Sequence, residues 1–242
     1  MITNIVTIAR IYMKWAFRNP ATYIFMVGVM PISILVPLLI VTPRAHVIDV
    51  IVGGMLFSVV AGGISDMSQN ISFDKQTKKL TLLITRPVSP FEYLLGMSLG
   101  GLCYNIIGSL LVFLFAFLSF SITLSVLAIF ETLIMLIVAW FISSCIGFVV
   151  GLYGPQDYRL NSATANILAF AFIFLAPAYY PVDAIPEPIK PLSYVAYTTH
   201  IAIIIKDVTV GQPVTPFNIL MVFTFLIVFL GLSKAGVKWR AK

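Results

Sequence analysis

The residues of this chain that are capable of chemistry are few and lie far apart. No glycine is followed by lysine, so the chain has no Walker A phosphate-binding loop, and it has no His-Glu-x-x-His zinc motif. The two histidines, His46 and His200, are distant in sequence, and Cys103 and Cys145 both lie in apolar runs. The sequence therefore predicts no catalytic centre, no metal site and no cofactor bound by this chain.

Two carboxylates interrupt the apolar segments. A charge at the centre of a bilayer costs about 2.5–3.5 kcal/mol on insertion scales, and such charges commonly mark transport pathways. Glu131 would lie deep in the bilayer and incur this cost in full if its helix begins at Ile122, and it would lie at the membrane interface if the helix begins near Leu127. Glu131 is thus a candidate for a transport path, with a packing or interfacial role as the alternative. Asp66 is expected at a helix end, facing water or a lysine.

The composition is that of an all-α polytopic membrane protein. Of 242 residues, 60% are hydrophobic and 10% are charged, against about 25% charged in soluble domains. Six spans of about 20 residues leave no room for a second globular domain, so residues 1–242 are expected to form one transmembrane domain. The net charge is +6, and the basic residues lie between the apolar runs. This placement indicates a signal for membrane topology and argues against nucleic-acid binding.

Hydropathy and turn residues predict six transmembrane helices. Their approximate ranges are 22–41, 47 into the polar stretch 65–70, 91–118, 122 or 127 to 152, 162–180 and 217–232. An even number of spans places both termini on one side, and twelve of the fifteen lysines and arginines lie on that side. The positive-inside rule therefore predicts cytoplasmic termini, in a multi-pass protein of the cell membrane.

Residues 1–20 are expected to lie along the membrane surface. Over 2–18, one helical face carries Ile5, Ile8, Ile11, Tyr12, Trp15 and Ala16, and the other carries Arg10, Lys14 and Arg18. This pattern is typical of an interfacial amphipathic helix.

The loop after the second span is also amphipathic. On a helix over 73–84, one face carries Phe73, Leu80, Leu83 and Ile84, and the other carries Lys75, Lys78 and Lys79. Such a helix can dock in a groove of a soluble partner, or it can rest on the lipid headgroups. Ser89-Pro90 and Glu92 then begin the third span, where Gly96 and Gly100 form a small-xxx-small pair that permits close helix packing.

Residues 181–207 do not behave as a simple loop. Prolines recur at 181, 186, 188 and 191, and the apolar stretch 195–208 is too short to cross a membrane. A re-entrant or interfacial structure on the outer face, with its backbone buried in protein, is expected.

These features together resemble the membrane subunit of ABC-2 type exporters. The resemblance covers nearly the whole chain, and it is carried by the segments Leu82–Pro90 and Leu94–Gly96 and by Tyr180-Pro181, Ile185-Pro186, Pro191–Tyr194 and Thr199-His200.

The resemblance implies partners and roles for particular residues. It implies a separate ATP-binding-cassette ATPase, which holds ATP and Mg, and a second permease copy. Region 72–86 would be the coupling helix, through Phe73, Lys75, Lys78, Lys79, Leu80, Leu83 and Ile84. Arg10, Lys14 and Arg18 would brace the same contact. Segment 181–207 would form the outer gate, with Tyr180, Pro181, Tyr194 and Tyr197 as candidates, although interfacial tyrosines also serve as simple anchors.

Alternatives to an exporter of hydrophobic or amphiphilic compounds remain at this stage. A permease for a polysaccharide or another glycoconjugate fits the same pattern. An ion-coupled secondary transporter commonly needs ionisable groups at mid-membrane, for which Glu131 is the candidate. A membrane-embedded enzyme would need a nucleophile, metal cluster or acid–base pair that the sequence does not show.

Overall fold

The computed structural model describes residues 2–18, 25, 29–85, 88–120 and 124–235, and the secondary structure in these ranges is helical, without strands. Among these described residues, five helices are long and apolar enough to cross a membrane. The first runs from Arg44 to Gln76 and comprises a short 3-10 turn η2 (Arg44–His46), α4 (Val47–Ala61), a π-helical turn η3 (Gly62–Asp66) and α5 (Met67–Gln76). The others are α7 (Pro90–Phe120), α8 (Val126–Tyr153), α9 (Tyr158–Leu175) and α12 (Pro216–Ala235).

The predicted span over 22–41 lies partly outside the described residues. Its described part is α3 (Met30–Val41), an apolar helix of 12 residues with Pro31 in its first turn and Pro37 inside it. A full crossing needs about 20 residues, so the count of six spans stays a prediction.

The helix α4 is the centre of the bundle. It packs against α3, α7, α8, α9 and α11. In the most apolar 18 residues of its span 83% are buried, whereas in those of α12 only 17% are buried. The outward faces of α7, α9 and α12 carry large exposed apolar side chains such as Leu114, Ile167 and Ile227. In a chain with this composition these faces are suited to lipid, because hydrocarbon removes their cost of hydration.

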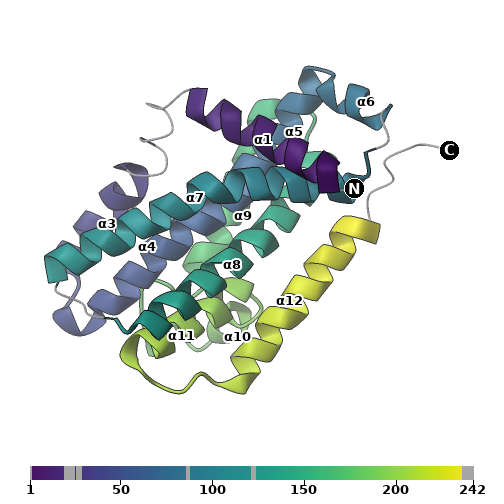
Figure 1. Ribbon diagram of the computed structural model, residues 1–242. Coiled ribbons are helices and arrows are strands. Elements are labelled where there is room, and N and C mark those ends of the chain that lie inside the picture. Colours follow the sequence, from purple (N-terminus) through teal and green to yellow (C-terminus); the bar gives the residue numbers. More distant parts are fainter. Residues whose placement is uncertain (1, 19–24, 26–28, 86–87, 121–123, 236–242) are drawn as a thin grey trace.

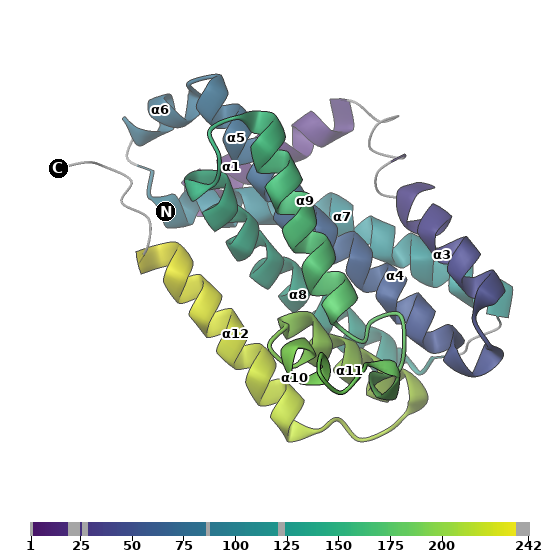
Figure 2. The same cartoon turned by 180° about the vertical axis from the view of Figure 1, so that it is seen from behind.

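Two groups of short helices cap opposite ends of the bundle. Figures 1 and 2 show α1 (Ile2–Arg18), α5 and α6 (Lys79–Ile84) at one end, and α10 (Lys190–Ser193) with α11 (Tyr197–Val210) at the other. The start of α1 and the end of α12 lie toward the same end. The segments predicted to be inner and outer are therefore separated by the length of the bundle.

Local capping signals explain where several spans begin. At α7, the Ser89 amide donates to Glu92 Oε2 at 2.8 Å and the Glu92 amide donates to Ser89 Oγ at 3.1 Å, a capping box that confirms the predicted start. At α8, Ser125 Oγ accepts from the Ala128 amide. The helix begins at Val126, so Glu131 lies in its second turn, as expected from the later of the two predicted starts.

The predicted range 162–180 for the fifth span is wrong at both ends. The helix α9 begins at Tyr158, because Asp157 caps it by accepting from the amides of Arg159 and Leu160. It ends at Leu175, where Ala176 takes an extended conformation just before Pro177.

The expected single helix over 73–84 is also wrong. The chain turns at Thr77 and Lys78, where Lys78 has φ 59° in the left-handed region, and α6 begins a new direction at Lys79. Phe73 and Leu80 consequently do not share a face, since Phe73 is 54% exposed and Leu80 is 8% exposed. We refer to residues 73–82 as the α5–α6 corner.

The segment between α9 and α12 folds into short elements, of which α11 is largely buried while most residues of 183–195 are exposed. It contains a 3-10 turn η4 (Val182–Ala184), the single turn α10, and α11, which has 14 residues and spans about 21 Å. The helix α11 packs against α4, α8, α9 and α12, and it ends at Gly211, which has φ 74°. Its length confirms the expectation of a helix too short to cross.

Candidate functional site

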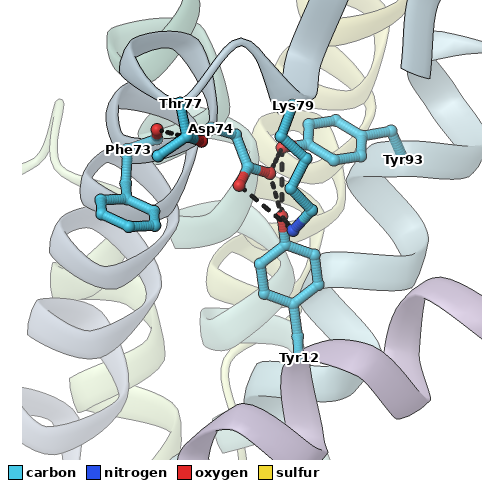
Figure 3. A network of polar contacts seen from close by, with 6 residues as sticks. All are labelled: Tyr12, Phe73, Asp74, Thr77, Lys79 and Tyr93. Carbon is cyan, nitrogen blue, oxygen red and sulfur yellow. Dashed lines mark hydrogen bonds and ion pairs between the residues drawn. The ribbon is translucent and has the colours of Figure 1, made fainter. Parts of the chain in front are cut away.

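A buried carboxylate joins four helices beneath the α5–α6 corner. Asp74 of α5 is 2% exposed, and its Oδ2 accepts hydrogen bonds from the hydroxyls of Tyr12 of α1 and Tyr93 of α7, the latter at 2.6 Å. Its Oδ1 lies 3.2 Å from the Nζ of Lys79, the first residue of α6. Figure 3 shows the four side chains converging on one point. We call Tyr12, Asp74, Lys79 and Tyr93 the Asp74 cluster.

The Asp74 cluster satisfies a charge that would otherwise be costly to bury. A buried carboxylate without partners is strongly unfavourable, and charge-assisted hydrogen bonds offset that cost. The Lys79 Nζ also lies 4.6 Å from the centroid of the Tyr12 ring, within cation–π range. Burial, together with the Asp74 carboxylate, raises the pKa of the Tyr12 hydroxyl well above its ordinary value, so Tyr12 remains a donor.

The helix α1 is seated directly on α7 next to this cluster. A Cβ atom added at Gly96 would lie 2.6 Å from the Ile8 Cβ, and one at Gly100 would lie 2.8 Å from the Ala9 carbonyl oxygen. Both distances are shorter than van der Waals contact, so only glycine permits this approach. The prediction that Gly96 and Gly100 allow close packing is confirmed, and the partner is α1.

The outer surface of the α5–α6 corner is apolar and basic. Phe73 is 54% exposed and Leu82 is 66% exposed, and the side chains of Lys78 and Thr81 are also exposed. Leu80 faces inward and packs in a cluster with Ile8, Ile71 and Phe148. The corner therefore has an anchored inner side and a free outer side.

The predicted coupling residues divide between these two sides. Phe73 and Lys78 lie on the outer side, whereas Lys79 belongs to the Asp74 cluster and Leu80 and Leu83 pack inward. Lys75 donates to the Leu152 carbonyl at 2.5 Å, at the end of α8. The Ile84 side chain, Arg86 and Pro87 lie outside the described residues.

The predicted bracing residues lie on the free side of α1, and their contact with an ATPase stays a prediction. Arg10, Lys14 and Arg18 are all exposed, while Ile8 and Tyr12 form the buried contact. Ile11, expected on the apolar face, is 49% exposed, and the Trp15 side chain lies outside the described residues.

The predicted gate residues also separate. Tyr197 is fully buried among Phe172, Phe225 and Phe229, and its hydroxyl lies 2.7 Å from Ser143 Oγ. The remaining three are nearer the surface. Tyr180 donates to the Phe174 carbonyl, Pro181 is half-buried, and Tyr194 is 38% exposed, with its carbonyl near His200 Nε2. Tyr197 is thus placed as a core residue.

Lys206 fastens the segment after α9 to the start of α4. Its Nζ lies 2.7 Å from Asp49 Oδ1 and donates to the carbonyls of Pro177 and Tyr180. Glu131 is half-buried in the second turn of α8, and the contacts of the described residues bring it to neither Lys206 nor the Asp74 cluster.

Sequence reasoning missed Asp74 as a site residue. Its partners stand 62 and 19 residues away in the chain, so the cluster leaves no periodic signal. The one local signal is an acid five residues before a lysine, on either side of a turn. Asp49 and Lys206 were missed for the same reason.

The fold and these sites define a multi-pass membrane protein with a structured corner at one end of its bundle. A sequence profile of the family described as ABC-2 type transporter matches residues 3–209. This match covers most of the chain, and the protein belongs to that family. No curated protein sequence matches the chain.

Proposed function

We propose that this chain is the permease subunit of an ATP-binding-cassette exporter and that a separate ATPase subunit docks on the α5–α6 corner. Membership of the ABC-2 family supports a membrane transport component that generally works with an ATP-binding partner. ATP and Mg are then held by the partner, and this chain supplies the membrane path.

The observation that carries the docking proposal is the two-sided corner. Phe73 and Leu82 expose apolar surface beside Lys78, and exposed apolar surface with a charged rim is typical of a protein interaction site. The inner side is tied to α1 and α7 through Asp74. A displacement of the corner is therefore passed to two helices at once.

The rest of the assembly follows from the same proposal. The protein lies in the cell membrane with the α5–α6 corner on the cytoplasmic side, a placement that the distribution of lysine and arginine supports. A second permease copy, identical or homologous, completes the path. The segment 181–207 at the opposite end is the outer gate, and the apolar bundle favours a hydrophobic or amphiphilic cargo.

The test is co-purification with a co-expressed ATP-binding-cassette ATPase, for which the neighbouring reading frames are the first candidates. Phe73→Asp and Leu82→Asp place charges in the interface without disturbing the core, and each is expected to reduce ATPase recovery at least tenfold. Ile189→Asp, at an apolar residue that is 45% exposed in the opposite segment, is the matched control and should leave recovery unchanged. Full recovery with both corner variants would exclude the corner as the docking site.

A further inference from the structure

A polar pocket lies within the bundle, apart from the Asp74 cluster. It is lined by side chains of three helices and is partly open to the surroundings, and the space in it that a water-sized group can enter is about 10 Å³, close to that of one water molecule. The lining residues that matter here are Asp66, Asn70, Met97, Gly101, Tyr104 and Trp140. Asp66 stands about 15 Å along its helix from the Gln76 end, within the first of the five membrane-spanning candidates.

The geometry of the pocket is set by close helix contacts. Trp140 Nε1 donates to the Ser98 carbonyl at 2.9 Å, which fixes the indole ring. A Cβ atom at Gly101 would lie 2.6 Å from that ring, so glycine makes room for it. Asn105 Nδ2 bridges from Asp66 Oδ2 at 3.1 Å to the Gly101 carbonyl at 3.3 Å. The carboxylate is thus oriented toward α7.

Asp66 closes the π-helical turn Gly62–Asp66. Single π-turns inside α-helices frequently occur at functional sites. Within the described ranges, no lysine, arginine or histidine forms an ion pair with Asp66. Its hydrogen-bond partners Asn105 and Tyr104 are neutral, so the pocket carries an uncompensated negative charge.

The lining matches one ligand chemistry. A carboxylate attracts a cation, the aromatic rings of Tyr104 and Trp140 line the pocket and can stabilise an ammonium by cation–π attraction, and Met67 and Met97 adapt to apolar groups of different shape. A charged residue in a membrane helix is a functional candidate by default. The space is far smaller than the roughly 300–1,000 Å³ usual for whole ligands, and at about the size of one water molecule it suits a primary ammonium group.

We propose that the Asp66 pocket binds the primary ammonium head group of an amphiphilic cargo, a long-chain alkylamine, while the alkyl tail remains in the surrounding hydrocarbon. The inference rests on the proposed function in that it gives the chemical class of the exported compound. Asp66 neutralises the charge, and Tyr104 and Trp140 form the wall of the head-group site.

The test measures binding to the purified full chain in dodecyl maltoside micelles by scintillation proximity. The probe is tritiated dodecylamine, which is protonated at neutral pH, and the uncharged comparison is tritiated dodecanol. The wild-type chain is expected to bind the cation saturably, and Asp66→Asn should weaken this binding at least tenfold. Asp66→Glu should stay within about threefold of wild type. Asp207→Asn, at a half-buried carboxylate of α11, is the matched control and should bind as wild type does.

Three results would overturn the proposal: no saturable binding of the cation, equal binding by Asp66→Asn and wild type, or saturable dodecanol binding that Asp66→Asn weakens equally. If Asp66→Asn does not give a monodisperse protein, Tyr104→Leu replaces it, with about fivefold weaker cation binding expected and unchanged binding as the contrary result. The assay contains no ATPase, so its outcome is separate from that of the docking experiment.

Discussion

The Nζ atom of Lys206 lies 2.7 Å from the Oδ1 atom of Asp49, and this ion pair joins α11 to the first turn of α4. The same ammonium donates to the carbonyls of Pro177 and Tyr180, which have no helical partner where α9 has ended. One side chain therefore ties three segments together at the end of the bundle opposite the α5–α6 corner.

Loss of Lys206 should destabilise this end of the protein. Removing one partner of a largely buried ion pair leaves the other charge uncompensated, and Lys206→Met is expected to cost about 2–4 kcal/mol of unfolding free energy. The measurement is thermal unfolding of the purified chain in detergent. Lys190→Met is the control, because its partner Glu187 is 87% exposed and such pairs contribute about 0–1 kcal/mol. Equal unfolding midpoints for the two variants would contradict the assigned role of Lys206.

Asp74→Asn should loosen the α5–α6 corner while the helices stay folded. The amide can still accept from Tyr12 and Tyr93, but the ion pair with Lys79 is lost. We expect several-fold faster tryptic cleavage at the exposed Lys78, and weaker cargo stimulation of ATP hydrolysis in the complex although the ATPase remains bound. Asp183→Asn, at an exposed residue, should change neither quantity. Wild-type coupling in Asp74→Asn would show that the cluster has only a structural role.

Gly100→Ala should displace α1 from α7. The added methyl would lie 2.8 Å from the Ala9 carbonyl oxygen, and backbone cannot move aside as a side-chain tip can, so a cost of about 1–3 kcal/mol is expected. Gly231→Ala is the matched control, since nothing lies within 4 Å of its Cβ position and alanine stabilises a helix interior by about 0.5–1 kcal/mol. Thermal unfolding should therefore shift in opposite directions for the two variants.

Cysteine labelling should locate the two ends of the bundle. In a Cys103→Ser background, with Cys145 buried, Lys78→Cys should react with a membrane-impermeant maleimide only in inside-out vesicles. Arg44→Cys should react only in intact cells, because Arg44 is exposed and begins the span whose other end, Gln76, lies in the corner. The reverse pattern would invert the predicted orientation.

Elements set by local signals could be predicted closely from the sequence. The helix α7 was expected over 91–118 and is observed over Pro90–Phe120, since Ser89, Pro90 and Glu92 act within one turn of the helix start. The predicted range of α9 began four residues too late, because the helix begins at Tyr158 after the cap formed by Asp157. The amphipathic spacing over 73–84 predicts one helix, because such spacing does not reveal the left-handed backbone conformation of Lys78.

The candidate sites were predicted only as far as they are contiguous in the chain. The loop after the second span was identified by its lysines and apolar residues. The sequence did not predict that Lys79 and Leu80 face inward or that Tyr197 is buried. Each depends on residues from other helices, and helical periodicity carries no information about which helices meet.

The sequence by itself determined that this protein is helical and membrane-embedded, that its charge is asymmetric, and that it belongs among ABC-2 transporters, because hydropathy, capping residues and family motifs are read along the chain. Tertiary structure alone decided that Asp74, Asp49 and Asp66 meet partners from other helices. Burial of a charge in a low-dielectric bundle is tolerated only where partners from separate helices converge, and that convergence exists only in the folded chain.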